Sequence, residues 1–134
     1  MKALAAAIAL ASVLTGCGLN VQSADLFVLT RTGQGKTLSM LVSDGGTISC
    51  NGAARKRLPD RLLIDARQLA SDLDADAKAR LRIPSRPGTV FTYTIKLQNG
   101  TISFPDSAGT QHAELARAQL FALQAAQGPC APGA

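Results

Sequence analysis

The chain opens with a continuous apolar run rather than with an alternating or helical pattern. Met1 and Lys2 form a short positive start, and residues 3–14 are then almost wholly apolar. A helix that spans a bilayer needs about 20 apolar residues, so this run is too short for a permanent transmembrane segment. A positive start followed by a short apolar run is typical of an export signal.

Beyond this run, apolar and polar residues alternate in the pattern of β-strands. The stretch Leu26–Arg31 is strand-like, and Thr32–Gly35 reads as a turn or loop. Two hairpins are predicted around dipeptides that tolerate the positive φ of a tight turn, Asp44-Gly45 and Asn99-Gly100. Their strands are Thr37–Val42 with Thr47–Cys50, and Val90–Leu97 with Thr101–Phe104.

Two further segments have the periodicity of amphipathic helices. The first opens at Pro59 and Asp60, where proline is tolerated and aspartate can cap the helix, and it ends before Pro84. The second covers about residues 111–127 and is stopped by Gly128-Pro129. The predicted inward residues are Leu62, Ala66, Leu69 and Leu73, with Leu63 and Ala70 beside them, in the first helix, and Leu115, Ala116, Leu120 and Leu123, with Phe121 or Ala122, in the second.

The order of these elements, β-β-β-α-β-β-α, predicts an α+β fold. We expect an antiparallel sheet of four to five strands, built from the two hairpins, with two helices packed on one face. Gly-Thr-Ile-Ser occurs at residues 46–49 and again at 100–103, each time leaving a hairpin turn. Four residues are too few to establish a duplication, but the shared hairpin-then-helix order supports a layered architecture. The length of 134 residues leaves room for one ordinary domain.

The residues that end the apolar run, Leu14-Thr15-Gly16-Cys17, resemble the lipobox of bacterial lipoproteins. The resemblance implies a diacylglyceryl group on the Cys17 thiol, cleavage before Cys17, and acylation (as by palmitate) of the new amino group. It divides the chain into a signal peptide at residues 1–16, a lipidated tether at 17–24 and a single domain at 25–134. The alternative is a chance cysteine in an ordinary secretory signal.

Two or more acyl chains give stable membrane attachment without help from the protein surface. The expected location is therefore the cell membrane or the outer membrane, with the domain lipid-anchored and facing the periplasm or the exterior. Gly18, which follows the lipidated cysteine, is compatible with either membrane.

Cys50 and Cys130 remain as an even pair in an exported chain, where oxidation is permitted. We predict a disulfide between them, which would pin the end of the first hairpin to the exit of the last helix. The alternative is two separate buried thiols.

Three partial motifs do not lead to a nucleotide or metal site. Gly35-Lys36-Thr37 resembles the end of a P-loop, but Thr30 stands where that motif needs glycine, and Thr37 opens a predicted strand. The Asp72, Asp74 and Asp76 spacing resembles the start of an EF-hand loop, but Ala77 and Ile83 replace its glycine and glutamate. His112 is the only histidine, so a histidine-rich metal site is excluded. We therefore expect no metal, no nucleotide and no cofactor.

No catalytic residue is predicted either. Asp106, Ser107 and His112 could be drawn as a triad, but the sequence has no nucleophile elbow around Ser107. We interpret Ser107 and Thr110 as caps at the entry to the last helix, and His112 as a solvent-exposed side chain.

Basic residues bracket the first predicted helix and contribute to a formal net charge of +5. The group before the helix is a candidate contact with an anionic surface, such as lipid headgroups or an acidic polymer of the envelope. The alternative is an ordinary solubilising face. Nucleic acid is not an expected partner, because stacking aromatics are missing among the basic residues and the chain is exported. The residues are Arg55, Lys56, Arg57 and Arg61 before the helix, and Lys78, Arg80, Arg82 and Arg86 after it.

The hairpin-then-helix order, with Tyr93-Thr94-Ile95 before Asn99-Gly100, also resembles emfourin-type inhibitors of thermolysin-like metalloproteases. That resemblance implies inhibition of a secreted metalloprotease through an edge strand or a loop. Our first hypothesis is a membrane-anchored, non-enzymatic binding or structural module of the envelope, with an envelope protein or an acidic polymer as partner. The inhibitor is the alternative, and an enzyme that uses Asp, Ser or Tyr93 in a cleft is a third hypothesis.

Overall fold

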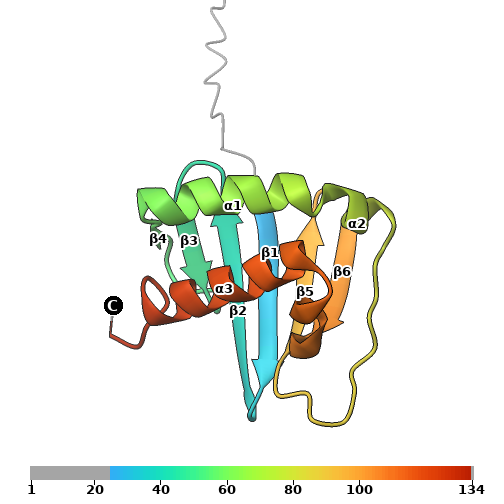
Figure 1. Ribbon diagram of the computed structural model, residues 1–134. Helices are drawn as coiled ribbons and strands as arrows, with labels where there is room; N and C mark the ends of the chain where they lie inside the picture. Colours follow the sequence, from blue (N-terminus) through green and yellow to red (C-terminus); the bar gives the residue numbers. More distant parts are fainter. Residues whose placement is uncertain (1–24, 134) are drawn as a thin grey trace, which may run out of the picture.

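The computed structural model describes residues 25–133, so the predicted signal peptide, Cys17 and the tether lie outside the described part of the chain. The described residues form an antiparallel sheet with helices on one face (Figure 1). The elements are β1 (Asp25–Gly33), β2 (Lys36–Ser43), β3 (Thr47–Cys50), β4 (Lys56–Arg57), α1 (Asp60–Asp72), α2 (Asp74–Lys78), β5 (Thr92–Leu97), β6 (Gly100–Pro105), the 3-10 helix η1 (Asp106–Thr110) and α3 (Ala113–Gln127).

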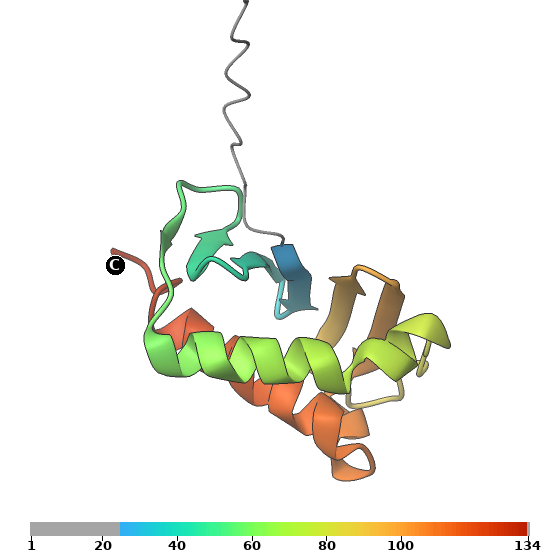
Figure 2. The ribbon, with the colours of Figure 1, turned by 90° about the horizontal axis from the view of Figure 1, so that it is seen from above.

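The strand order is β4-β3-β2-β1-β5-β6, and every neighbouring pair is antiparallel. Pairing of β1 with β5 joins the two predicted hairpins into one sheet. Seen from above, α1 and α3 lie on the same side of this sheet (Figure 2). The predicted α+β fold is confirmed. The sheet has six strands within residues 25–133, where four to five were expected, because β4 is only two residues long and has no strand pattern of its own.

The hydrophobic core lies between the sheet and the two long helices. Alternate residues of the strands point toward the helices, as the period of two requires. Phe27 packs edge-to-face on Phe121 of α3, with ring centroids 5.5 Å apart. Burial of each large side chain of this kind stabilises the fold by about 1.5–3 kcal/mol. The strand residues that are at most 2% exposed are Phe27, Leu29, Met40, Val42, Ile48, Ile95, Ile102, Phe104 and Pro105.

The first predicted helix is correct in its buried stripe and wrong in its length. Leu62, Ala66, Leu69 and Leu73 are all buried, as expected. The helix does not continue to Pro84, because it breaks at Leu73 and the short helix α2 ends at Lys78. The break lets α2 pack against the start of β6, where a Cβ built on Gly100 would overlap the carbonyl oxygen of Ala77.

The starts of the helices also differ from prediction. Pro59 occupies the N-cap of α1 and Asp60 is the first helical residue, with no side-chain cap bond. Ser107 and Thr110 do not cap α3, because both lie in η1, where the Thr110 hydroxyl donates to the carbonyl oxygen of Ser107 at 2.9 Å. His112 takes the N-cap position of α3, again without a side-chain cap bond.

The inward face of α3 was predicted only in part. Leu115, Phe121 and Ala122 are buried as expected, but Leu120 and Leu123 are 52% and 45% exposed. Ala118 and Ala125, which were not predicted, complete the buried stripe. Small side chains let the helix approach the sheet closely. Because α3 is apolar on most sides, this close packing determines which of its faces is buried.

One outer edge of the sheet is covered by a loop. After α2 the chain turns at Arg80, whose φ is 53°, and runs along β6. The backbone nitrogen of Ile83 donates to the oxygen of Ser103 at 2.8 Å, and the nitrogen of Ser103 donates to the oxygen of Leu81 at 3.0 Å. The backbone groups of Ser103, in the middle of this edge of β6, are therefore paired rather than open.

Candidate functional site

The face of the sheet that points away from α1 and α3 is not covered by any helix of the described residues (Figure 2). We call it the open face. Its side chains are those of the strand positions that alternate with the core positions, and most of them are half-buried or exposed. A sheet with one solvated face normally carries polar residues there, so the identity of these residues decides whether the face is more than a solvated surface.

Hydroxyl side chains form two rows across the middle of the open face. In the first row the register places Thr30 between Ser39 and Thr94, and Thr94 beside Ser103. The Thr30 hydroxyl lies 3.4 Å from the Ser39 hydroxyl. In the second row Thr32 lies between Thr37 and Thr92. Neighbouring strands are about 4.8 Å apart, so each row offers regularly spaced groups that both donate and accept hydrogen bonds.

A third row has different chemistry and lies nearer the end of the sheet where β1 begins, which we call the tether end. Here Val28 lies between Leu41 of β2 and Lys96 of β5. Ser49 and Thr101 extend the row on the two sides. Val28, Leu41 and Lys96 line a shallow hollow of about 440 Å³ that also includes Asp25 and Gln98. Val28 and Leu41 thus form a small aliphatic surface beside an exposed lysine.

Cations lie at both sides of the open face. Register pairs Arg57 with Thr47 and Lys56 with the fully buried Ile48, so Arg57 shares the open face with Thr47. The Arg55 guanidinium donates to the Thr47 hydroxyl at 3.3 Å and lies 3.7 Å from the Asp25 carboxylate. On the opposite side, Arg80 and Arg82 line a hollow together with Thr101 and Ser103.

Acidic groups are rare on this sheet. Asp25 is the one acidic residue in the six strands of the described part of the chain, and it is paired with Arg55. Arg57 has an ion pair with Asp60 at 3.3 Å, but both side chains are more than 80% exposed. Such exposed pairs contribute little and are screened by salt, so Arg57 stays available to an anionic ligand.

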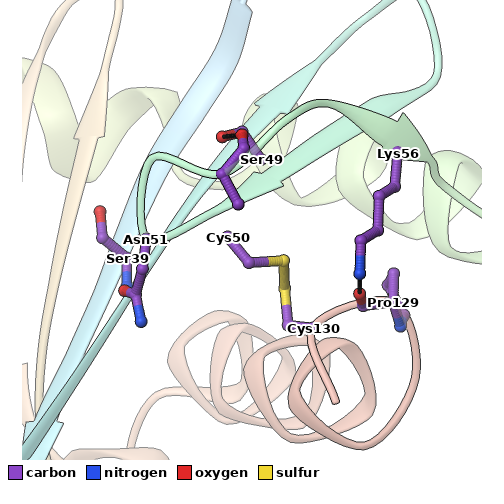
Figure 3. Close-up of a disulfide and its surroundings, with 8 residues drawn as sticks. Ser39, Ser49, Cys50, Asn51, Lys56, Pro129 and Cys130 are labelled. Carbon is purple, nitrogen blue, oxygen red and sulfur yellow. Dashed lines mark hydrogen bonds between the residues drawn. A yellow bond between two sulfur atoms is a disulfide. The ribbon is translucent and has the colours of Figure 1, made fainter. Parts of the chain in front are cut away.

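The four residues of the predicted basic group do not form one patch. Strand alternation separates Lys56 from its neighbours and directs it to the C-terminal segment, where its Nζ donates to the carbonyl oxygen of Pro129 at 3.3 Å (Figure 3). Arg61 lies on α1 and lines a groove between α1 and α3. Arg55 and Arg57 remain on the open face. The sequence alone does not show that Lys56 points away from the face that Arg55 and Arg57 share. This follows only from the pairing of β4 with β3.

The predicted disulfide agrees with the structure. Cys50 at the end of β3 and Cys130 after α3 lie at bonding distance, with their Cα atoms 5.6 Å apart (Figure 3). The turn after Cys50 is fixed by Asn51, whose φ is 51° and whose side-chain oxygen accepts a bond from the Ser39 nitrogen at 2.8 Å. The hydroxyl of Ser49 donates to the oxygen of Ala53 at 2.6 Å. These bonds hold the loop that leads to Arg55.

The groups that could be drawn as a catalytic triad have other partners. The Asp106 carboxylate accepts bonds from the backbone nitrogens of Val90 and Phe91, both at 3.1 Å. The His112 ring lies 3.4 Å from the Glu114 carboxylate, and its side chain is 38% exposed. Within residues 25–133 no three His, Cys, Asp or Glu side chains gather in a way that could hold a metal ion.

The groove between α1 and α3 is a hollow with polar lining, of about 230 Å³. Its charges are mixed, with Arg61 and Arg117 beside Asp65 and Asp72. The Arg117 guanidinium lies 2.8 Å from the Asp72 carboxylate, and the Gln68 amide donates to Asp72 at 2.9 Å. Because its ionic groups neutralise one another, this groove shows no preference for a ligand of one sign.

Shifted pKa values occur away from the open face. Burial raises the pKa of Asp76, and the nearby Glu114 carboxylate raises it further. Hydrogen bonds from Lys78 and Asn99 lower the pKa of Asp74. Burial raises the pKa of Tyr93, which points toward the helices. Asp74 and Asp76 lie in α2, and Tyr93 lies in the core.

Reasoning from the sequence missed the open face as a site, although a signal was present. Five strands contain hydroxyl residues two positions apart, which places both on the same face. The pairs are Thr30 with Thr32, Thr37 with Ser39, Thr47 with Ser49, Thr92 with Thr94, and Thr101 with Ser103.

No helix within residues 25–133 has the length and apolar content to cross a bilayer. The predicted lipid site Cys17 lies outside the described residues. Comparison with models of known protein families, with curated protein sequences and with solved structures finds no match for this chain.

Proposed function

We propose that this protein is a lipid-anchored, non-enzymatic binding module of the bacterial envelope, and that the open face of its sheet binds an anionic ligand. The export signal and the lipobox at Leu14-Thr15-Gly16-Cys17 support the anchoring. The open face supports the binding role.

The observation that carries the proposal is the composition of this face. Rows of hydroxyl groups lie between Arg55 and Arg57 on one side and Arg80 and Arg82 on the other, and the one acidic residue of the strands is paired. Guanidinium groups form short, charge-assisted hydrogen bonds with phosphate and carboxylate oxygens. Hydroxyl groups can complete such contacts as donors. The face therefore suits a flat or extended ligand that carries negative charge.

Anchoring is tested by the intact mass of protein extracted from membranes, with a Cys17→Ala variant as control. We expect the wild type to begin at a lipid-modified Cys17 and the variant to leave the membrane fraction. A mature chain without lipid would contradict the anchoring.

Binding is tested by titration of the protein with a soluble polyuronate while backbone amide signals are followed by NMR. We expect shifts at amides of β1, β5 and β6, and weaker shifts in a variant in which Arg57 and Arg82 are replaced by glutamine. A variant with Arg61 and Arg117 replaced by glutamine has the same charge change in the helix groove and serves as the matched control. Shifts confined to α1 and α3 would contradict the assignment of the binding face.

Inhibition of a secreted metalloprotease stays an alternative prediction. A β-strand addition mechanism needs an open sheet edge, and on the outer edge of β6 the backbone groups of Ser103 are already paired with Leu81 and Ile83. This leaves β4, of two residues, as the edge strand on the other side. The inhibitor hypothesis is tested by assay against a panel of thermolysin-like enzymes.

A further inference from the structure

The tether end of the open face has a chemistry that differs from the hydroxyl rows and lies where the chain leaves the fold toward its predicted anchor. We propose that this surface, formed by Val28, Leu41, Lys96, Arg55 and Arg57, rests on the anionic lipid surface of the membrane that holds the anchor. The inference names the partner of part of the open face and rests on the proposed lipidation of Cys17.

The length of the tether keeps the domain close to the bilayer. Eight residue steps separate Cys17 from Asp25, where β1 begins. A fully extended chain spans about 3.5 Å per residue, so the first residue of β1 lies within about 28 Å of the lipidated cysteine. Asp25 is opposite Ser43, at the end of the sheet that Arg55 also reaches through its contact with Asp25. The tether end is thus the part of the domain that the anchor holds nearest to the headgroups.

The residues of the tether end match an interfacial contact. Val28 and Leu41 lie side by side on the open face, in adjacent strands, and offer a small aliphatic surface. Lys96 is directly beside Val28 on the next strand, and Arg55 and Arg57 lie beyond β3 on the other side. Aliphatic side chains flanked by basic residues are the composition that favours binding to the boundary between headgroups and acyl chains.

The helix surface is the competing candidate. It exposes Ile64, Leu120 and Leu123, with 65%, 52% and 45% of each residue accessible. However, the groove beside Leu120 is lined by Asp65 and Asp72 as well as by Arg61 and Arg117, so this surface has no excess of cations. Anionic headgroups repel carboxylates and attract cations, and each basic residue near the surface increases partitioning onto the membrane about five-fold. The excess of cations therefore favours the open face over the helix surface.

The absence of tryptophan from the sequence permits a direct test of which surface meets the lipid. The lipidated mature protein is reconstituted in vesicles of brominated phosphatidylcholine, alone or in equimolar mixture with phosphatidylglycerol. A single tryptophan is introduced by Val28→Trp on the open face or by Ile64→Trp on the helix surface. Bromine quenches tryptophan fluorescence only over short distances, so quenching reports contact with the bilayer.

We expect strong quenching of the Val28→Trp reporter in vesicles that contain phosphatidylglycerol, and little quenching of Ile64→Trp. Lys96→Glu in the Val28→Trp background should lower the fraction of molecules whose open face contacts the bilayer by about five-fold or more. Arg86→Glu makes the same charge change in a distant loop and should leave this fraction unchanged. High salt should act like Lys96→Glu because it screens the attraction.

Three results would overturn the inference. They are absence of quenching at position 28 in anionic vesicles, equal or stronger quenching at position 64, and quenching at position 28 that does not depend on anionic lipid. Leu41→Trp provides a second reporter on the same row, so that a folding defect of one variant does not decide the result. Mass analysis of the reconstituted protein separates the two proposals, because a lipidated protein without quenching contradicts only this inference, and an unlipidated mature chain contradicts the proposed function.

Discussion

Removal of the Cys50–Cys130 disulfide should lower the free energy of unfolding by several kcal/mol. The perturbation is the double variant Cys50→Ala with Cys130→Ala. Both cysteines are half-buried and pack against the core, so the variant removes a covalent link and a small amount of packing. Chemical reduction of the wild type removes the link alone and leaves both sulfurs in place, and it therefore serves as the control.

The magnitude follows from the length of chain that the disulfide closes. The two cysteines are 80 residues apart in the sequence. In the chain-entropy treatment, a loop of this length restricts the unfolded state by about 4.5 kcal/mol at 25 °C. Domains of this size are stable by about 5–15 kcal/mol, so the loss is a third or more of the total. With a urea dependence near 2 kcal/mol per molar, the unfolding midpoint should fall by about 2 M.

The assay is equilibrium unfolding in urea followed by far-ultraviolet circular dichroism, because the chain has no tryptophan. We expect the reduced wild type and the double variant to lose nearly the same stability. A loss below about 1 kcal/mol in both would refute the loop-closure reasoning. A much larger loss in the double variant than in the reduced protein would show that packing of the sulfurs, rather than the closed loop, accounts for the effect.

Four further substitutions test the packing and the electrostatics of the fold. Gly100→Ala should lower stability by about 1–3 kcal/mol, because its Cβ would overlap the carbonyl oxygen of Ala77 and displace α2; an unchanged urea midpoint would contradict this close approach. Leu115→Ala should lower the free energy of unfolding by about 2–5 kcal/mol and Leu120→Ala by much less, since Leu115 is fully buried and Leu120 is 52% exposed. Equal losses of stability in thermal or urea unfolding would contradict this assignment of the buried face of α3. Burial and Glu114 raise the pKa of Asp76, so its protonated form stabilises the fold below the unfolded-state pKa, and that contribution is lost as the pH rises through the folded-state pKa. Asp76→Asn should therefore raise the urea midpoint at pH 7 relative to the wild type and change it little at pH 3, and a larger gain at pH 3 would contradict the sign.

The strands and the first helix could be predicted because their signals are local. Alternation fixes which residues of β1 and β5 share a face, and Asn99-Gly100 permits the tight turn of the second hairpin. The spacing of Leu62, Ala66 and Leu69 marks one stripe of α1, since Asp65, Arg67 and Gln68 between them are charged or polar. In α3 half of the residues between the leucines are alanine, so several stripes are apolar and tertiary packing selects among them.

The candidate site could be predicted only in fragments, because it depends on pairing between distant segments. The sequence shows that Thr92 and Thr94 share a face but not that this face lacks a helix. It shows Arg55 and Arg57 as near neighbours, and only their pairing with β3 separates them from Lys56. The break of the first helix at Leu73 was not predicted for the same reason. It accompanies the contact between α2 and Gly100, and no local helix breaker in the sequence marks it.

The edges of the sheet have a consequence for the anchored state that we propose. Domains tethered by lipid in one membrane plane would collide repeatedly with the same side-by-side geometry, and two bare strand edges that meet in this way can join into a continuous sheet and aggregate. Residues 81–83 already use the backbone groups of Ser103 on the outer side of β6, and the opposite edge is the two-residue, doubly charged β4. Both edges are thus poor templates for strand pairing, so a domain anchored as proposed would resist polymerisation through its edges at high local concentration.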